Sequence, residues 1–298
     1  MVRAFISLQC PAFISLQFPP LSTSSCSPGL SLCLFLSLAQ GFTPVLVCPA
    51  QLSVPADYED LSRELEQRGF KVYTAPLTRL GWITGLAPSA FTLDYLRGTL
   101  QPASTLKFYY EAIDSAVEAI DQDFPGKPFH LLAHSIGGWV GRSWMGESCS
   151  DDLRKRIVSF TTLGTPHNPP PSSSILASID QTRGLLSYVN SNWPGAYHNG
   201  IRYTSVVGEG QEGKFSGEIE ELLAFVSYLP LSGTGEGIGD GIIPSETAYL
   251  EGSDKIVLPR AKHSGFVPTL GDSIKLKDYP WYGDSEGVEG WVGALRRR

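Results

Sequence analysis

The stretch that decides the fold of this chain runs Phe129-His130-Leu131-Leu132-Ala133-His134-Ser135-Ile136-Gly137-Gly138-Trp139-Val140. An apolar run ends at Ser135, and small residues follow it at once. This pattern is typical of a buried strand that turns sharply into a helix and presents a serine hydroxyl at the turn. The two backbones come close together there, so the residues two before and two after the serine must be small. Here they are Ala133 and Gly137.

Two interpretations fit this serine. A catalytic nucleophile is commonly carried on such a turn, whereas a serine that only caps a helix after a core strand gives a similar local pattern. The usual nucleophile pattern has glycine at both small positions, so Ala133 is a departure, although a sterically mild one. We favour the nucleophile, and this choice requires a histidine and an acid further along the chain.

Length and charge narrow the class of protein. A chain of 298 residues holds one large α/β domain or two small ones, and its core needs neither disulfides nor metal for stability. The formal net charge is -7 and no dense stripe of Lys and Arg occurs, so we expect no nucleic-acid partner. No group of Cys and His has the spacing of zinc ligands, and we expect neither a metal nor a cofactor.

The first 41 residues differ from the rest of the chain. They contain eight serines between Ser7 and Ser37, while the first acidic residue is Asp57 and the only basic residue before it is Arg3. Such a composition is typical of a transit peptide, and we expect residues 1–41 to be a disordered leader that targets the protein to a plastid. The apolar segment 30–39 supports a secretory signal as the alternative, although no basic region directly precedes it.

From residue 42 to residue 298 we expect one α/β domain. Short apolar runs alternate with helical patterns, which is typical of a mostly parallel central sheet with helices on both faces. Strands are expected at 44–49, 72–75, 129–134, 156–163, 201–207 and 255–259. Helices are expected at 57–68, 104–124, 136–145, 217–229 and 285–295, and a long loop at 76–102.

Residues 168–200 break this alternation. After Asn168 come three prolines and three serines, and an apolar helical pattern follows near 175–188. Insertions after a core strand commonly form lids or substrate-binding caps. We therefore expect a lid here, which would also contact a membrane surface, and a passive surface loop is the alternative.

A serine nucleophile needs a histidine to accept its proton and an acid to orient that histidine, in the chain order Ser, Asp, His. Four of the five histidines lie beside the serine or before any acid loop, which leaves His263 as the expected base. Asp240 is the expected acid, because glycines on both sides permit the bend that aims its carboxylate inward. Asp254 is the alternative, but it directly precedes a strand.

Ester attack creates an oxyanion, which needs preorganised N–H donors. One donor is expected from the residue after the nucleophile, Ile136, and the second from the loop after the first strand. Gln51 and Leu52 are the candidates there, because Pro49 has no N–H. Many proteins with this turn carry His-Gly in that loop, so the sequence Pro49-Ala50-Gln51-Leu52 is a departure.

Four motifs in order resemble those of the lipases and esterases of the α/β-hydrolase superfamily. They are Ala133-His134-Ser135-Ile136-Gly137-Gly138, Thr162-Leu163-Gly164-Thr165-Pro166-His167, Gly239-Asp240-Gly241-Ile242-Ile243-Pro244 and Lys262-His263-Ser264. From about Pro44 onwards the chain is similar to plant and algal plastid-type lipase-like hydrolases. The resemblance implies the α/β-hydrolase fold and cofactor-free hydrolysis of carboxylic esters through an acyl-enzyme, and a structural role for His167.

Lipid or other hydrophobic acyl esters are the substrates that the resemblance implies. The alternative is a non-catalytic α/β-hydrolase scaffold that binds a ligand or partner, and the unusual Ala50-Gln51 loop is its main motivation. A thioesterase or an acyltransferase would use the same three residues. The retention of serine, aspartate and histidine in the expected order favours the enzyme. The oligomeric state does not follow from the sequence.

Overall fold

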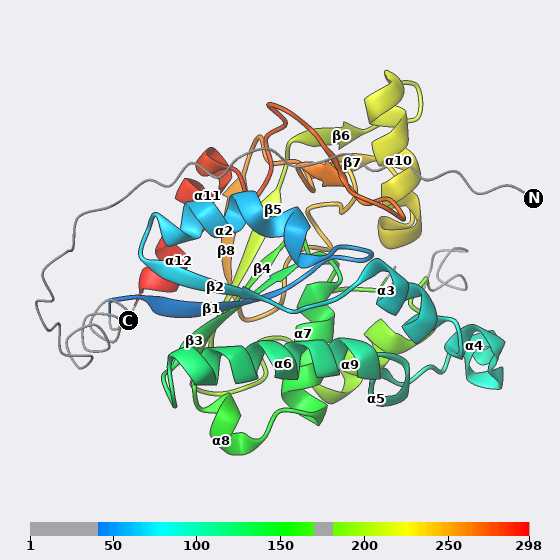
Figure 1. The fold of residues 1–298 in the computed structure, drawn as a ribbon. Helices are drawn as coiled ribbons and strands as arrows, with labels where there is room; N and C mark the ends of the chain where they lie inside the picture. The colour runs from blue at the N-terminus through cyan, green and yellow to red at the C-terminus, as the bar shows by residue number, and fades with distance from the viewer. Residues whose placement is uncertain (1–40, 170–180, 298) are drawn as a thin grey trace, which may run out of the picture. The chain divides into compact units, whose positions relative to one another are not determined.

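The computed structural model describes residues 41–169 and 181–297, which belong to one compact unit, Gly41–Arg298 (Figure 1). All but the last residue of the predicted leader 1–41 lies outside the described residues. So do residues 170–180 of the predicted insertion 168–200. The leader therefore stays a prediction, and the insertion is described only at its two ends.

The centre of the unit is a six-stranded sheet in the order β2-β1-β3-β4-β5-β8, in which every neighbouring pair is parallel. Its strands are β1 (Thr43–Cys48), β2 (Phe70–Thr74), β3 (Phe129–His134), β4 (Ile157–Leu163), β5 (Arg202–Gly208) and β8 (Asp254–Leu258). The inner strands are almost wholly buried, which explains why they are continuous apolar runs in the sequence. The predicted fold class is confirmed.

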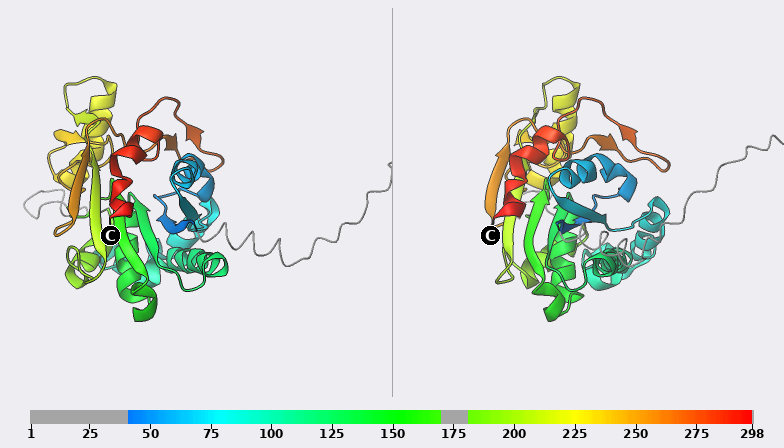
Figure 2. Two further views of the ribbon diagram at one scale, coloured as in Figure 1. Left: turned by 90° about the vertical axis from the view of Figure 1, so that its left-hand side faces the viewer. Right: turned by 60° about the vertical axis from the view of Figure 1, so that its left-hand side comes forward.

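Helices cover both faces of this sheet (Figure 2). On one face lie α2 (Glu59–Glu66), α11 (Ser285–Trp291) and α12 (Gly293–Arg296). On the other lie α6 (Lys107–Asp123), α7 (Gly137–Glu147) and α9 (Leu185–Asn192). The first face is sealed by a core in which Val45 and Val47 of β1 meet Leu61 of α2 and Trp291 of α11. Parallel strands place all their carboxyl ends at one edge, where ligands of such folds bind.

Shorter elements gather at that carboxyl edge (Figure 1). The strands β6 (Gln211–Gly213) and β7 (Gly237–Gly239) pair antiparallel, and β6 packs against α10 (Ile219–Ser232). The strands β9 (Phe266–Val267) and β10 (Ile274–Lys275) form a second antiparallel pair. These two additions border the loops that carry the predicted site residues.

The predicted loop 76–102 is wrong, because most of it is helical. It contains α3 (Arg79–Leu86), η2 (Ser89–Phe91) and α4 (Leu93–Arg97), and α5 (Pro102–Thr105) follows. The Thr78 side chain caps α3 by accepting a hydrogen bond from the Gly81 N–H. A Cβ on Gly85 would collide with the ring of Phe108 on α6. Gly85 therefore permits close packing of α3 against α6 in a segment that the sequence analysis expected to be a loop.

The other expected helices have slightly different ends. The helix predicted at 57–68 begins as the 3-10 turn η1 (Pro55–Tyr58) and continues as α2. The last predicted helix is divided into α11 and α12, and a short α8 (Asp151–Arg154) was not predicted. No helix within residues 41–169 and 181–297 is long and apolar enough to cross a membrane.

Candidate active site

Ser135 stands at a strained turn between β3 and α7. Its backbone has a φ of 55°, in the left-handed region that costs a non-glycine residue energy. The Ser135 N–H donates to the Leu163 carbonyl at 2.9 Å, which ties the turn to β4. A Cβ on Gly137 would collide with the Cys48 carbonyl oxygen, and one on Gly138 would collide with the Thr165 side chain. The closeness of the backbones therefore requires the small residues that the sequence shows after the serine.

Asp240 and His263 meet at the carboxyl edge of the sheet. The Nδ1 of His263 lies 2.8 Å from Oδ2 of Asp240, and the His263 N–H donates to the Asp240 carbonyl at 2.8 Å. The carboxylate is 2% exposed, and its Oδ1 accepts the N–H groups of Ile242 at 3.0 Å and Ile243 at 2.7 Å. The alternative acid, Asp254, lies exposed at the start of β8 and pairs with Arg297 at 3.1 Å.

Tyr282 is a site residue that the sequence reasoning missed. Its buried hydroxyl donates to Oδ2 of Asp240 at 2.8 Å and accepts the Gly208 N–H at 2.8 Å. Burial, with the nearby charge of Asp240, raises the pKa of Tyr282 well above its ordinary value, so this hydroxyl remains a donor. With His263, Ile242 and Ile243 it completes a set of four donors around one carboxylate. No local pattern marks this tyrosine, which lies 42 residues after the acid.

Ser135 and His263 line the same cavity, which has a volume of about 480 Å³. Because Asp240 occupies Nδ1 of His263, Nε2 is the nitrogen left to act toward the serine. Among the described residues the Ser135 hydroxyl has no hydrogen-bond partner, His263 included. Catalytic hydrogen bonds commonly tighten only when substrate binds.

A second cavity, of about 610 Å³, also reaches Ser135. We name the first the His263 cavity, whose apolar lining includes Leu223, Ile242, Phe266 and Val267. The second is the Trp82 cavity, whose apolar lining includes Trp82, Leu86, Leu185, Leu186 and Val226. Gln51, Ser135 and Ile242 line both cavities, so the serine stands where they join. A larger hollow of about 1000 Å³ beside α11 contains none of the predicted site residues.

Of the predicted oxyanion donors, the structure brings Ile136 and Gln51 to the serine. Both line the Trp82 cavity, and within the described part of the chain neither N–H donates to a protein acceptor. Leu52 lines neither cavity, and its backbone has a φ of 59°. The choice between Gln51 and Leu52, which the sequence left open, therefore favours Gln51.

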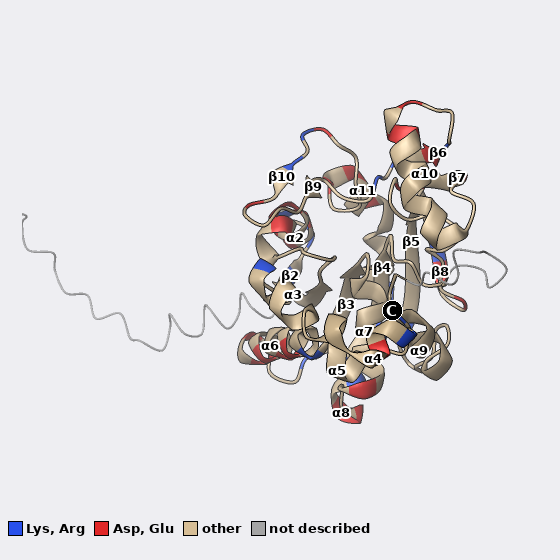
Figure 3. Cartoon of the chain, turned by 90° about the vertical axis from the view of Figure 1, so that its right-hand side faces the viewer, with Lys and Arg blue, Asp and Glu red and all other residues tan. Residues whose placement is uncertain are grey.

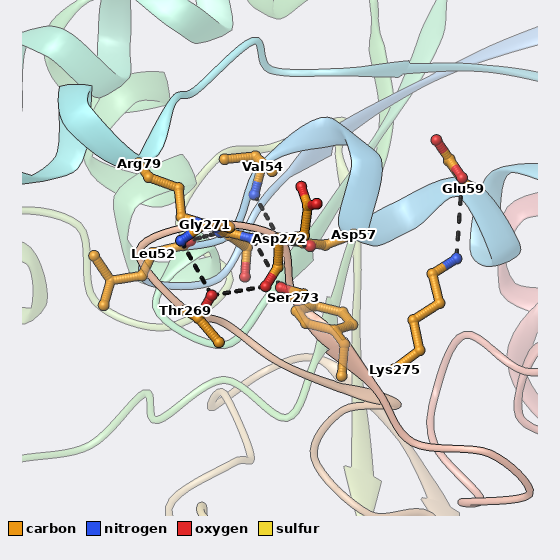
Figure 4. Close-up of polar contacts among 12 residues, drawn as sticks. Leu52, Val54, Asp57, Glu59, Arg79, Thr269, Gly271, Asp272, Ser273 and Lys275 are labelled. Atoms are coloured by element: carbon orange, nitrogen blue, oxygen red, sulfur yellow. Dashed lines mark hydrogen bonds and ion pairs between the residues drawn. The ribbon is translucent and has the colours of Figure 1, made fainter.

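Arg79 holds the loop that carries Gln51 (Figure 4). Its guanidinium donates to the Leu52 carbonyl, and it pairs with the buried carboxylate of Asp57 at 3.2 Å. The same side chain donates to the Gly271 carbonyl at 2.6 Å and to the Ser273 hydroxyl at 2.8 Å. One cation thus joins the loop after β1 to the loop between β9 and β10.

Two other histidines are buried near the elbow and stay neutral. Burial, and to a lesser degree the neighbouring His263, lowers the pKa of His134 to about 3. Burial, with the charge of Arg142, lowers the pKa of His167 well below its ordinary value. His167 bonds to the Thr162 hydroxyl at 3.1 Å and lines neither cavity. In the described ranges no group of three His, Cys, Asp or Glu side chains is placed to hold a metal ion.

Comparison with known proteins finds lipases. Lipase 1 of Staphylococcus aureus is 26% identical over 152 residues, which are 43% of this chain and 22% of that protein. A lipase of Staphylococcus epidermidis is 25% identical over 154 residues, with the same coverage of 43% and 22%. The chain thus spans about a fifth of the length of these curated relatives. No protein-family profile matches the chain.

Solved structures with a similar arrangement include a lipase and a phospholipase. Bacillus licheniformis lipase BlEst2 in its mature form has a TM-score of 0.46 at 15% identity, covering 72% of this chain and 82% of that one. Phospholipase PlaB from Legionella pneumophila has a TM-score of 0.49 at 16% identity, covering 76% of this chain and 54% of that one.

The parallel sheet with a serine on a strained strand-to-helix turn is the α/β-hydrolase fold. The chain has this fold and is similar in sequence to lipases, as the resemblance implied. The relatives named above are bacterial, so they give no support to the plastid-type part of that resemblance.

Proposed function

We propose that this protein is a serine hydrolase that cleaves carboxylic esters with a hydrophobic acyl group. The observation that carries the proposal is the relation of Ser135, His263 and Asp240. The serine lies on a strained turn and shares a cavity with His263, whose other ring nitrogen is held by a buried carboxylate. Similarity to proteins named lipase supports the same reaction class.

In the proposed mechanism Ser135 Oγ attacks the ester carbonyl while Nε2 of His263 takes the hydroxyl proton. The N–H groups of Ile136 and Gln51 receive the charge that develops on the carbonyl oxygen. His263 then returns the proton to the leaving alcohol as its C–O bond breaks, and the acyl group stays on the serine. Water, deprotonated by His263, attacks this acyl-enzyme, and His263 returns the proton to Ser135 Oγ as the Oγ–acyl bond breaks and the carboxylic acid leaves.

The two cavities suit the two halves of an ester. The leaving oxygen must accept the proton from His263, so the alcohol portion occupies the His263 cavity. The oxyanion donor Ile136 borders the other side, so the acyl chain enters the Trp82 cavity. Most of the surface that lines each cavity is apolar, which favours a substrate with a hydrophobic group on each side of the ester bond.

Exposed apolar side chains near the cavities support contact with a lipid surface. Phe91 is 91% exposed, Ile219 on α10 is 78% exposed, and Leu270 between β9 and β10 is 78% exposed. In Figure 3 charged residues lie on α2, α6, α8 and the segment around β10, whereas α3 and most of α10 carry few. Exposed apolar groups of this kind mark interaction sites when they gather in one region. We propose that the side of the molecule that carries Phe91, Ile219 and Leu270 contacts aggregated ester substrate.

A covalent probe tests the proposal directly. A fluorophosphonate should label the full chain but not the Ser135→Ala variant, and only the unsubstituted chain should hydrolyse a panel of acyl esters. Ser115→Ala is the matched control, because this serine is exposed on α6 and far from the elbow in sequence. Well-folded protein without labelling or turnover would contradict the proposal and favour a non-catalytic scaffold. Thioesters in the same panel would identify a thioesterase.

The leader and the cellular compartment remain proposals from the sequence. Residues 1–41 are proposed to be removed from a plastid protein, with secretion as the alternative. N-terminal sequencing of the mature protein, with the compartment in which it is found, tests both. An N-terminus at Met1 or Val2 would exclude a cleaved leader.

A further inference from the structure

His134 lies beside the proposed nucleophile and contacts the loops on both sides of it. Its Nε2 is 2.8 Å from the His263 carbonyl oxygen, in the loop that carries the proposed base. Its Nδ1 is 2.9 Å from the Tyr58 hydroxyl, which in turn accepts the Ala50 N–H at 2.7 Å. Ala50 directly precedes Gln51, the proposed oxyanion donor. One chain of hydrogen bonds therefore joins the oxyanion loop to the base loop.

The direction of these bonds follows from the groups themselves. A carbonyl oxygen can only accept, so the Nε2 of His134 must carry the hydrogen. The ring is neutral, so its Nδ1 is an acceptor and the Tyr58 hydroxyl donates to it. The hydroxyl oxygen then accepts from Ala50. Each donor and acceptor in this hydrogen-bond chain is used once. In the other tautomer of His134, Nε2 would carry no hydrogen and its bond to the His263 carbonyl would be lost.

Packing leaves these rings little freedom. His134 is 1% exposed and Tyr58 is fully buried. The His134 ring lies 4.9 Å from the His263 ring and 5.9 Å from the Tyr58 ring, centre to centre. Phe266 packs edge-on against both Tyr58 and His134. A shift of either loop would therefore be transmitted to the other through His134.

We infer that His134 and Tyr58 are positioning residues that fix the oxyanion loop and the base loop relative to each other, with Ser135 between them. The inference rests on the proposed serine-hydrolase function and adds to it. Neither side chain takes part in the chemistry. Their role is to keep the Gln51 N–H and the His263 ring in the geometry that the transition state needs.

Three substitutions test this inference in the full chain. Tyr58→Phe keeps the ring and removes the hydroxyl, and His134→Phe removes both bonds of the imidazole. His134→Gln is the conservative variant, because its amide oxygen can accept from Tyr58 while its NH₂ donates to the His263 carbonyl. We expect the two phenylalanine variants to lower kcat about 10-fold or more, with KM within about twofold of the unsubstituted protein. His134→Gln should recover most of that loss.

Tyr109→Phe is the matched control. Tyr109 is also fully buried, and its hydroxyl donates to the Pro49 carbonyl of the same loop at 2.5 Å. Among the described residues, however, no chain of hydrogen bonds joins the Tyr109 hydroxyl to His263. If Tyr58 and His134 act as one unit, the variant that combines Tyr58→Phe with His134→Phe should have about the same kcat as either single variant. Tyr109→Phe combined with His134→Phe should instead give the product of the two single effects.

The results separate this inference from the proposed function. If the unsubstituted protein neither turns over esters nor reacts with a fluorophosphonate, the proposed function fails. If it is active and the folded Tyr58→Phe variant keeps its kcat, or loses activity only through KM, the positioning role is refuted. An effect of Tyr109→Phe equal to that of Tyr58→Phe would likewise reduce the role to general support of the loop. Circular dichroism and melting temperature establish whether each variant is folded. If His134→Phe does not fold, the kcat of Tyr58→Phe alone tests the positioning role.

Discussion

Replacing Asp240 with asparagine should abolish turnover by giving His263 the wrong tautomer. The two oxygens of this carboxylate have different partners: Oδ1 accepts two backbone N–H groups, and Oδ2 faces His263 and Tyr282. Those backbone donors can be satisfied only by the amide oxygen of an asparagine. Its NH₂ group must then face His263 and donate to Nδ1. The histidine proton moves to Nε2, which can no longer accept the proton of Ser135.

The expected loss can be estimated from this geometry. An aspartate-to-asparagine change that keeps a triad in place but reverses the histidine tautomer lowers kcat about 10⁴-fold in a serine protease. That factor corresponds to about 5.4 kcal/mol of activation free energy at 1.36 kcal/mol for each factor of ten. The fold should persist, since the side chain keeps its size and its bonds to Ile242 and Ile243. We therefore expect an inactive protein with a cooperative melting transition.

The assay is steady-state hydrolysis of a chromogenic short-chain ester, with the rate of fluorophosphonate labelling as a second readout. Asp254→Asn is the matched control, because this exposed aspartate was the alternative acid and makes one surface ion pair. Its kcat should stay within about twofold of the unsubstituted protein, since surface ion pairs contribute little. The reasoning is refuted if folded Asp240→Asn keeps more than about a tenth of the activity. It is equally refuted if Asp254→Asn is the variant that loses it.

Three further predictions concern the two cavities, Tyr282 and the buried His130 of β3. Val226→Trp should narrow the Trp82 cavity and reduce kcat/KM in a series of esters with longer acyl chains, by about fourfold for each excluded methylene. Val267→Trp should narrow the His263 cavity and have the same effect in a series of esters with longer alcohols. If each variant instead affects the other series, our assignment of the two cavities is reversed. Tyr282→Phe should lower the free energy of unfolding by about 3 kcal/mol in chemical denaturation, because it removes a hydrogen bond to a buried carboxylate and leaves the Gly208 N–H unpaired. A loss below about 1 kcal/mol would contradict this prediction. Burial lowers the pKa of His130 to about 4, so between about pH 6.5 and pH 4 the unfolded chain binds a proton at this residue that the folded chain does not. The free energy of unfolding should therefore fall as the pH is lowered through this range, by up to about 1.4 kcal/mol per pH unit for this residue. Denaturation curves of His130→Asn should show a shallower fall, and an unchanged slope would exclude the effect.

The relative placement of the candidate site residues was largely predictable from the sequence, because it depends on one local pattern and on topology. The elbow identifies a strand and its serine, and parallel strands put every later loop at the same edge of the sheet. A histidine after the last strand and an aspartate in the loop before it must then approach that serine. The glycines around Asp240 favoured it over Asp254, and the structure puts Asp240 beside His263 and Asp254 on the surface.

Other parts of the site depend on contacts that no local pattern records. Tyr282 reaches Asp240 only because the chain returns along the sheet after β8. The choice between Gln51 and Leu52 depended on which of them lines the cavities and on the left-handed conformation that Leu52 adopts without being glycine. The helices at 79–97 were predicted as part of a long loop, because a glycine such as Gly85 lowers helix propensity, whereas here it is needed for packing against Phe108.

The unusual sequence of the loop after β1 was the main argument for a non-catalytic scaffold, and the hydrogen bonds of this loop weaken that argument. Three buried or half-buried side chains hold this loop: Tyr58 at Ala50, Tyr109 at Pro49 and Arg79 at Leu52. The Gln51 N–H between these points has no protein acceptor in the described ranges, and Gln51 lines both cavities that contain Ser135. A loop held at three points beside the free N–H of Gln51 is costly to maintain, because each fixed residue loses conformational entropy. Such preorganisation is what an oxyanion site requires, since its donors must be in place before the charge develops. The unusual sequence Pro49-Ala50-Gln51-Leu52 therefore fits a hydrolase with its own means of fixing this loop better than it fits a scaffold that has lost one.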